Sequence, residues 1–139
     1  MTEPVFRAHC PVEVRFRDCD PMGHVNNAVY LTYLELARFA YWKAADIGRL
    51  AGEVSYIIAR VEIDFRSPAV TGDVLDVAIA VTGFGRTSFS MAYEIRNQDG
   101  RLVAAAKSVQ VAYDYAAEKT VPLSEAIKQR ISEFEERAL

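Results

Sequence analysis

The sequence predicts an α+β domain in which an antiparallel sheet curls around one long helix. The residues after Asn26 form a long run that is apolar over most of a helical circumference. Segments with alternating apolar and polar residues follow it and are separated by short turns, which indicates antiparallel pairing. The length of 139 residues suits one domain, so residues 1–139 are expected to fold as a single unit.

The long helix is expected to begin after Asn26 or Asn27, either of which can cap its first turn, and to end at Gly48. Its main polar residues fall on one stripe that covers less than half of the circumference; they are Thr32, Glu35, Arg38, Lys43 and Asp46. Such a helix must be buried on most sides, which favours a sheet that wraps around it.

Five strands are expected from alternating patterns. The first signal is VEVRF at 12–16, where apolar and charged residues alternate. The phase of the alternation changes within 54–65, which predicts a bulge near Ala59 and Arg60. The other strands are expected at about 75–81, 89–95 and 101–115.

Turn and terminal signals complete the order of elements. NQDG, at 97–100, predicts a hairpin turn. The strand after it has Val109, Val111 and Tyr113 on one face. A C-terminal amphipathic helix is expected with Pro122 in its first turn, and its apolar stripe is Leu123, Ile127, Ile131 and Phe134.

The composition excludes several classes of protein. A net charge of -3 argues against a general nucleic-acid binder. The first residues lack the apolar core of a signal peptide, and no apolar run reaches the ~18 residues of a membrane span. Cys10 and Cys19 are too few for a disulfide framework. We therefore expect a cytoplasmic protein with neither a nucleic-acid nor a membrane partner.

Reactive side chains gather directly before the long helix, in FRDCDPMGHVNN at 16–27. Asp20 is the strongest catalytic candidate, because Pro21 and Gly23 shape the loop between it and the helix. The structural alternative is a loop acid that accepts hydrogen bonds from nearby backbone N–H groups. Asp18 is the weaker candidate. His24 can be a general base, a hydrogen-bond donor to substrate or a brace for the loop.

Metal and thiol chemistry are disfavoured by spacing. The possible ligands His9, Cys10, Cys19 and His24 match none of the usual zinc patterns, so no metal is expected. A nucleophilic Cys19 with His24 as its base is equally disfavoured, since a lone cysteine is usually a small buried residue. The sequence has no nucleophile elbow, P-loop or dinucleotide fingerprint.

A carboxylate beside a helix N-terminus fits one kind of reaction well. The free N–H groups of the helix start carry partial positive charge and can polarise a carbonyl. A thiol with a pKa of about 8.5 leaves as the thiolate without strong acid assistance. Thioesters therefore suit so sparse a site better than amides do.

The motif FRDCDPMGHVNNAVYLTYLELAR, at 16–38, resembles the signature of the 4-hydroxybenzoyl-CoA thioesterase family, which has the hotdog fold. The resemblance extends over most of the chain. It includes the order of the strands and two further segments, which are RSPAVTGDVL at 66–75 and GRTSFSMAYEI at 85–95. It implies an acyl-CoA thioesterase without cofactors. It also implies dimers whose sheets join, or dimers of dimers, with acyl-CoA sites at the subunit interface.

The resemblance assigns roles to individual residues. Asp20 matches the catalytic aspartate, which acts as nucleophile or as base on water, and the Asn27 N–H matches the group that polarises the thioester carbonyl. The supporting role of His24 stays open. HVNN also resembles the acyl-ACP thioesterases of plants, but Met22 stands where their motif has an asparagine.

Substrate contacts are expected from Tyr30 and Met22 near the acyl group, and from Ser88. Arg66 and Arg86 are expected at the CoA phosphates, because arginine forms paired hydrogen bonds with phosphate. Three alternatives stand beside an acyl-CoA thioesterase. One is a non-catalytic acyl-CoA-binding hotdog module, another is an acyl-ACP thioesterase, and the last is a hotdog hydratase or dehydratase.

Overall fold

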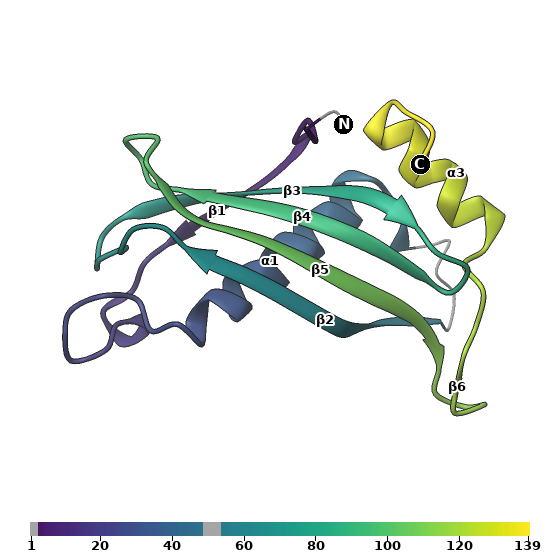
Figure 1. Cartoon of the computed structure of the whole chain (residues 1–139), viewed down its shortest axis with the longest axis horizontal. Helices are drawn as coiled ribbons and strands as arrows, with labels where there is room; N and C mark the ends of the chain where they lie inside the picture. The colour runs from purple at the N-terminus through teal and green to yellow at the C-terminus, as the bar shows by residue number, and fades with distance from the viewer. Residues whose placement is uncertain (1–2, 49–53) are drawn as a thin grey trace.

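The computed structural model describes residues 3–48 and 54–139, and its main feature is one sheet laid over one helix (Figure 1). The strands are β1 (Ala8–Glu13), β2 (Ser55–Phe65), β3 (Val74–Phe84), β4 (Ser88–Arg96), β5 (Leu102–Asp114) and the short β6 (Lys119–Thr120). The helices are a short 3-10 turn η1 (Phe16–Asp18), the long α1 (Val29–Ala44) and the C-terminal α3 (Glu125–Glu135).

All the strand pairs are antiparallel, and the order across the sheet is β1-β3-β4-β5-β2. The short β6 pairs with the end of β5. Both β1 and β2 are therefore edge strands. The connection that carries the chain from one edge to the other contains α1, so this helix lies across one face of the sheet.

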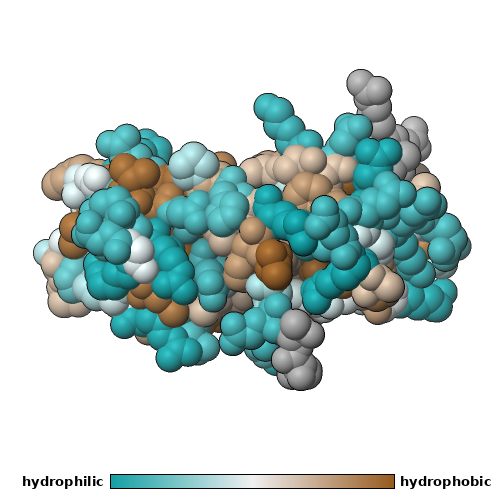
Figure 2. All heavy atoms as spheres, turned by 90° about the horizontal axis from the view of Figure 1, so that it is seen from above, coloured by the Kyte–Doolittle hydropathy of each residue, from teal (hydrophilic) through white to brown (hydrophobic). Residues whose placement is uncertain are grey.

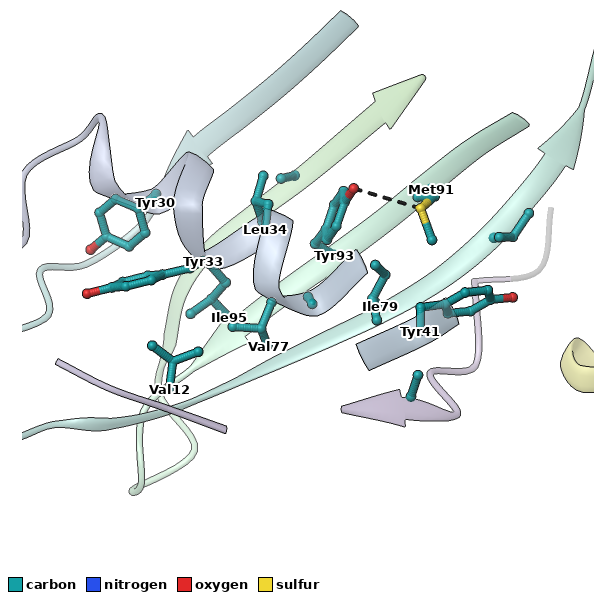
Figure 3. Packing of buried hydrophobic residues seen from close by; sticks show 14 of the residues in the cluster. Val12, Tyr30, Tyr33, Leu34, Tyr41, Val77, Ile79, Met91, Tyr93 and Ile95 are labelled. Atoms are coloured by element: carbon teal, nitrogen blue, oxygen red, sulfur yellow. Dashed lines mark hydrogen bonds between the residues drawn. The ribbon is translucent and has the colours of Figure 1, made fainter. Parts of the chain in front are cut away.

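The core lies between α1 and the sheet, as Figure 3 shows. Leu34, Ala37 and Tyr41 of α1 are fully buried. They face alternate residues of the central strands, which are also buried; these are Leu75, Val77, Ile79 and Val81 of β3 and Phe89, Met91, Tyr93 and Ile95 of β4. The sequence pattern predicted these two strands and their inward faces correctly. The expected fold, a sheet around one long helix with a further C-terminal helix, is confirmed.

The turn signals and the bulge are also confirmed. The register between β2 and β5 shifts between Ile58 and Arg60, where the change of phase predicted a bulge. At the hairpin between β4 and β5, the Asn97 side chain accepts hydrogen bonds from the Asp99 and Arg101 N–H groups. Gly100 adopts a φ of 81°, a left-handed conformation that glycine tolerates well.

Several predicted boundaries are wrong. The first strand covers Ala8–Glu13 and ends before Phe16, because the 3-10 turn η1 begins there and leaves the Phe16 ring 86% exposed. The long helix ends at Ala44 and not at Gly48, since Asp46 takes the left-handed conformation, with a φ of 55°, that terminates it. Pro122 lies before the C-terminal helix, whose N-cap is Ser124.

The face of β5 that meets the helix is not the face that the sequence makes most apolar. Val109, Val111 and Tyr113 share one face, as expected, but they are only half-buried. The buried residues are those of the opposite face: Ala106, Ser108, Gln110 and Ala112. Two polar side chains of β5 thus lie in the interior.

On the face seen in Figure 2, hydrophilic residues predominate and hydrophobic residues form separate patches. Some large apolar side chains of α1 and of the edge strand β2 are exposed; they are Leu31, Leu36, Phe39, Ile58 and Phe65. Among the described residues, none of the helices combines the length and the apolar character needed to cross a membrane.

A buried carboxylate fastens α3 to the domain. Glu135 is 5% exposed and accepts hydrogen bonds from the Tyr41 hydroxyl, at 2.6 Å, and from the Val81 N–H, at 2.9 Å. Burial and the Glu135 carboxylate raise the pKa of Tyr41, so its hydroxyl remains a donor. One acidic side chain therefore joins α1, β3 and α3.

We expect Tyr41→Phe to lower the free energy of unfolding by about 1.5–3 kcal/mol, the usual contribution of a hydrogen bond to a charged group. Chemical denaturation of both proteins measures the difference. The matched control is Tyr115→Phe, because the Tyr115 side chain is 62% exposed, and its stability should equal that of the wild type. Equal stability of Tyr41→Phe and the control would contradict the role of this contact.

Candidate active site

The loop before α1 is held in place by Asp18. This side chain is only 2% exposed and accepts hydrogen bonds from the Arg15 N–H and the Arg15 guanidinium. Its Oδ2 also accepts one from the Tyr33 hydroxyl, at 2.8 Å. Asp18 therefore links the end of η1 to the second turn of α1.

The electrostatics of Asp18 suit this structural role. Burial alone would raise the pKa of the carboxyl group, but the hydrogen bonds from Arg15 and Tyr33 and the positive charge of Arg15 outweigh burial and lower it. Asp18 is thus ionised at neutral pH. Burial, together with this carboxylate, raises the pKa of Tyr33, which keeps the phenol protonated as a donor.

Asp20 lies two residues further on, in a tight turn. Its Oδ1 accepts hydrogen bonds from the Met22 N–H, at 2.9 Å, and from the His24 N–H, at 3.4 Å. The main chain closes the same turn, because the Asp20 N–H donates to the His24 carbonyl and the Gly23 N–H donates to the Asp20 carbonyl. Within the described residues Oδ2 has no hydrogen-bond partner, so one carboxylate oxygen is fixed and the other is free.

His24 braces this loop with its main chain. Its carbonyl accepts from Asp20, and His24 also forms an isolated β-bridge with Val70, in the loop between β2 and β3. The neighbouring Val25 N–H donates to the Ala69 carbonyl in that loop. The imidazole is exposed and has no hydrogen-bond partner in the described part of the chain, so it is available to a ligand.

The entrance to α1 presents backbone N–H groups. The Asn26 side chain accepts from the Ala28 N–H, and the Asn26 carbonyl accepts from the Val29 N–H. Asn26 thus supports the first turn, although the residue at the N-cap position itself is Ala28. The N–H of Asn27 finds no acceptor within residues 3–48 and 54–139, so it remains a free donor at the positive end of the helix.

Asp20, His24 and Asn27 line one pocket of about 490 Å3, which we call the Asp20 pocket. Its other lining residues come from the start of α1, the end of β2 and the loop segments next to them; they are Val25, Tyr30, Phe65, Arg66, Ser67 and Pro68. Tyr30 forms its inner wall, because the ring is buried and packs against Phe65 with centroids 5.2 Å apart. Burial raises the pKa of Tyr30, so its hydroxyl is neutral.

The structure thus brings together five of the residues that the sequence suggested: Asp20, His24, Asn27, Tyr30 and Arg66. Met22 is highly exposed on the loop and does not line the pocket. Arg86 lies in the turn between β3 and β4, and Ser88 is the first residue of β4. Ser88 pairs with Val111 of β5, whereas the Arg66 N–H bonds to the Val103 carbonyl of the same strand. Ser88 and Arg66 are therefore about 26 Å apart along β5.

Sequence reasoning missed four lining residues, Val25, Phe65, Ser67 and Pro68. The only local signal was the Ser-Pro pair at the end of a strand, which marks a turn but not a pocket. The Ser67 hydroxyl donates to the Leu102 carbonyl at 2.7 Å, which ties this turn to β5.

The cysteines do not form a reactive centre. Cys10 and Cys19 are both free thiols. Cys19 Sγ lies 3.4 Å from the Thr71 hydroxyl, and no hydrogen bond links it to the His24 ring within the described residues. In the described part of the chain, no three His, Cys, Asp or Glu side chains are grouped so that they could hold a metal ion.

The Asp20 pocket therefore combines a carboxylate oxygen without a partner, a free helix N–H and an accessible imidazole, with an aromatic wall behind them. A carboxylate can attack a carbonyl or activate water, and an N–H donor can stabilise the oxyanion that forms. A fold in which one sheet covers one long helix, with such a pocket at the helix start, defines a hotdog-type thioester hydrolase.

Comparison with known proteins gives the family. A family model described as the thioesterase-like superfamily matches residues 14–131, so the chain belongs to this superfamily. The expected enzyme class, a thioester hydrolase, and the expected resemblance are thereby confirmed.

Individual relatives agree with this assignment. A solved structure of a thioesterase from Thermus thermophilus, complexed with coenzyme A and Zn, is 39% identical, covers 95% of this chain and 97% of its own, and has a TM-score of 0.83. The long-chain acyl-CoA thioesterase FadM of Escherichia coli is 26% identical over 88% of this chain and 96% of its own. A 1,4-dihydroxy-2-naphthoyl-CoA hydrolase of Synechococcus elongatus is 28% identical over 83% of this chain and 88% of its own.

We expect Asp18→Asn to lower the free energy of unfolding by about 2–4 kcal/mol at pH 7, because the buried contacts of Arg15 and Tyr33 lose a charged acceptor. Since folding lowers the pKa of Asp18, its stabilisation is complete above the unfolded-state pKa of about 3.9 and is lost as the pH falls through the folded-state value. Denaturation curves at several pH values should show the wild type and the variant converging in acid.

The control is Asp99→Asn in the exposed hairpin, which should match the wild type at every pH. A constant difference between wild type and Asp18→Asn down to strongly acidic pH would contradict the ionised, structural role of Asp18.

Proposed function

We propose that this protein hydrolyses acyl-CoA thioesters to a free acid and CoA, with the Asp20 pocket as its active site. The observation that carries the proposal is the presence of the Asp20 carboxylate and the free Asn27 N–H in the walls of one pocket. The two relatives described above act on acyl-CoA substrates by name, and the Thermus structure contains coenzyme A, which supports this class of substrate.

In the proposed reaction the thioester carbonyl oxygen accepts a hydrogen bond from Asn27 N–H, which stabilises negative charge as it develops. The free oxygen of Asp20 then has two possible roles. It attacks the carbonyl carbon, expels CoA as a thiolate and forms an anhydride that water hydrolyses, or it takes a proton from a water that attacks directly. Either route needs little help for the leaving group, because a thiol has a pKa of about 8.5.

The fixed oxygen of Asp20 supports this assignment. Hydrogen bonds from Met22 and His24 hold Oδ1, and therefore the plane of the carboxylate, before substrate arrives. Such preorganisation reduces the reorganisation that the reaction needs. His24 adds an exposed imidazole on the same pocket, where it can donate a hydrogen bond to the acyl or pantetheine part of the substrate.

Arg66 is the better placed of the two arginines for the CoA phosphates. It lines the Asp20 pocket, and its contact with Asp64 is an exposed pair at 3.8 Å, which a phosphate can replace. Arg86 and Ser88 lie at the other end of the sheet in the same chain, so a contact from them to this site would have to come from a second copy.

We further infer that two copies pair through the edge strand β2. An unpaired edge presents free N–H and carbonyl groups and is usually covered or paired. The exposed apolar side chains of Phe39 and Ile58 lie beside this edge, and pairing would remove them from water. A non-catalytic acyl-CoA-binding module would share this dimer and this pocket, and only turnover distinguishes the two.

We expect Asp20→Asn to lower kcat for acyl-CoA hydrolysis by about 10²–10⁴-fold, because a general base or nucleophile is lost. The turnover number is measured by the release of free thiol from a panel of acyl-CoA and acyl-ACP substrates. Asp99→Asn, at an exposed aspartate of the β4–β5 hairpin that does not line the pocket, is the control and should keep wild-type turnover. Wild-type turnover in Asp20→Asn would refute the assignment, and no turnover of any thioester by the wild type would favour the binding module.

We expect the protein to sediment as a dimer or a dimer of dimers at micromolar concentration. Phe39→Asp should shift it towards monomer, because a charge then lies beside the paired edge, while the Phe39 side chain, 64% exposed, contributes little to the core of one chain. Phe16→Asp, at another exposed phenylalanine that belongs to η1 and not to α1 or β2, is the control and should not change the mass. A monomeric wild type would be evidence against pairing.

A further inference from the structure

The loop between β2 and β3 supplies one wall of the Asp20 pocket, through Arg66, Ser67 and Pro68. The main chain of this wall is fixed at its start, where the Arg66 and Ser67 N–H groups both donate to the Val103 carbonyl of β5. Pro68 has no N–H group, so its carbonyl oxygen is the only main-chain group through which a hydrogen bond can hold it. The position of this wall residue therefore depends on a donor from outside the loop.

That donor is Arg101, the last residue of the hairpin between β4 and β5. Its Nη2 lies 3.0 Å from the Pro68 carbonyl oxygen, and within the described residues no other hydrogen bond reaches that oxygen. The main chain of Arg101 is itself fixed, because its carbonyl accepts from the Asn97 N–H and its N–H donates to the Asn97 side chain. Arg101 does not line the Asp20 pocket, so its contact with the pocket is indirect.

A second side chain of the same hairpin supports the far end of the β2–β3 loop. The Gln98 amide donates to the Asp73 carboxylate, and its oxygen accepts from the Val74 N–H, both at 3.0 Å. Asp73 is 8% exposed, and its other oxygen accepts from the Val70 N–H. The hydrogen bonds from Val70 and Gln98 lower the pKa of Asp73 more than burial raises it, and the positive charge of Arg101 adds to this effect. The carboxylate is therefore ionised at neutral pH and holds the loop as a charged acceptor.

The hairpin, the β2–β3 loop and the loop before α1 lie together at one end of the molecule (Figure 1). Hydrogen bonds join each to the next, because Arg101 and Gln98 reach the β2–β3 loop from one side and the Val25 N–H reaches it from the other. The loop before α1 has its own side-chain support in Asp18, which bonds to α1 and not to the hairpin. The two walls of the pocket are thus held by different side chains.

We propose that Arg101 is a positioning residue of the Asp20 pocket: by holding the Pro68 carbonyl, it places the wall that meets the non-reacting part of the substrate. The inference rests on the proposed thioester hydrolysis at Asp20 and adds to it a residue outside the pocket. In that reaction the thioester carbonyl lies beside Asn27, on the side that Asp18 supports. Contacts made by the other wall are the same in the ground state and the transition state, so Arg101 acts on KM and not on kcat.

Direct binding of the CoA phosphates by Arg101 is the alternative role for an exposed arginine near the pocket. The structure favours positioning, because one terminal nitrogen of Arg101 is already bonded to Pro68 and the arginine that lines the pocket is Arg66. The two roles differ for a substrate without the nucleotide. Positioning affects every substrate that touches the wall, whereas a phosphate contact affects only CoA thioesters.

The test measures kcat and KM of the purified full chain for octanoyl-CoA and for S-octanoylpantetheine, which lacks the nucleotide. Because one hydrogen bond is lost, we expect Arg101→Ala to raise KM by about threefold to tenfold for both substrates and to leave kcat within about twofold of the wild type. Gln98→Ala, which removes the second support of the loop, should also raise KM. Arg130→Ala on α3 removes the same charge from an exposed pair with Asp46, and this matched control should keep wild-type values.

A second measurement separates this inference from the proposed activity. Calorimetry with S-octyl-CoA and S-octylpantetheine, thioethers that cannot be hydrolysed, reports binding without turnover, and Kd should rise in Arg101→Ala by the same factor as KM. A wild type that hydrolyses no thioester but shows this difference in Kd would refute the activity and keep the positioning role. Unchanged KM and Kd in Arg101→Ala would overturn that role, as would a fall in kcat alone or a rise confined to the two CoA ligands.

Discussion

The candidate site depends on the buried carboxylate of Asp18. Its contacts with Arg15 and Tyr33 fix the loop against α1, and everything that follows in the loop takes its position from this point. The Asn26 N–H donates to the Asp18 carbonyl, so the main chain of the same residue also sets where the helix begins. A free carboxylate at Asp20 and a free N–H at Asn27 can face one pocket only because this short segment is rigid.

Two aspartates separated by one residue thus have opposite environments. Asp18 is enclosed, and its contacts with Arg15 and Tyr33 lower its pKa and occupy both of its carboxylate oxygens. Asp20 is half-buried and keeps one oxygen without a partner among the described residues. The difference follows from their places in the loop. Asp18 ends the 3-10 turn and bonds to Tyr33 of α1, whereas Asp20 begins a turn whose contact with the β2–β3 loop is made by His24 and Val70.

Much of this architecture could be predicted from the sequence, since the large apolar residues of β3 and β4 fall on alternate positions and the phase change in β2 marks its bulge. Asp20, His24 and Asn27 were found because they are neighbours in one motif. Phe65 and Pro68 could be placed at the same pocket only by the fold, which brings the end of β2 to the start of α1. The buried face of β5 could not be predicted from the apolar pattern, because the larger apolar residues of this strand, Val109 and Val111, face outwards.

That reversal in β5 has a physical basis in the helix that it meets. The inward positions hold Ala104, Ala106 and Ala112, whose small side chains leave room for the large rings of α1 and β4. Where the inward residues are instead Ser108 and Gln110, their side chains form a hydrogen-bonded row with Tyr93 and Arg38. Polar groups at this depth lower stability unless they are paired, and in this row only Gln110 Oε1 lacks a partner among the described residues. The same helix thus has the free Asn27 N–H of the Asp20 pocket at its N-terminus and, about three turns later, the Arg38 side chain that bonds to this polar row.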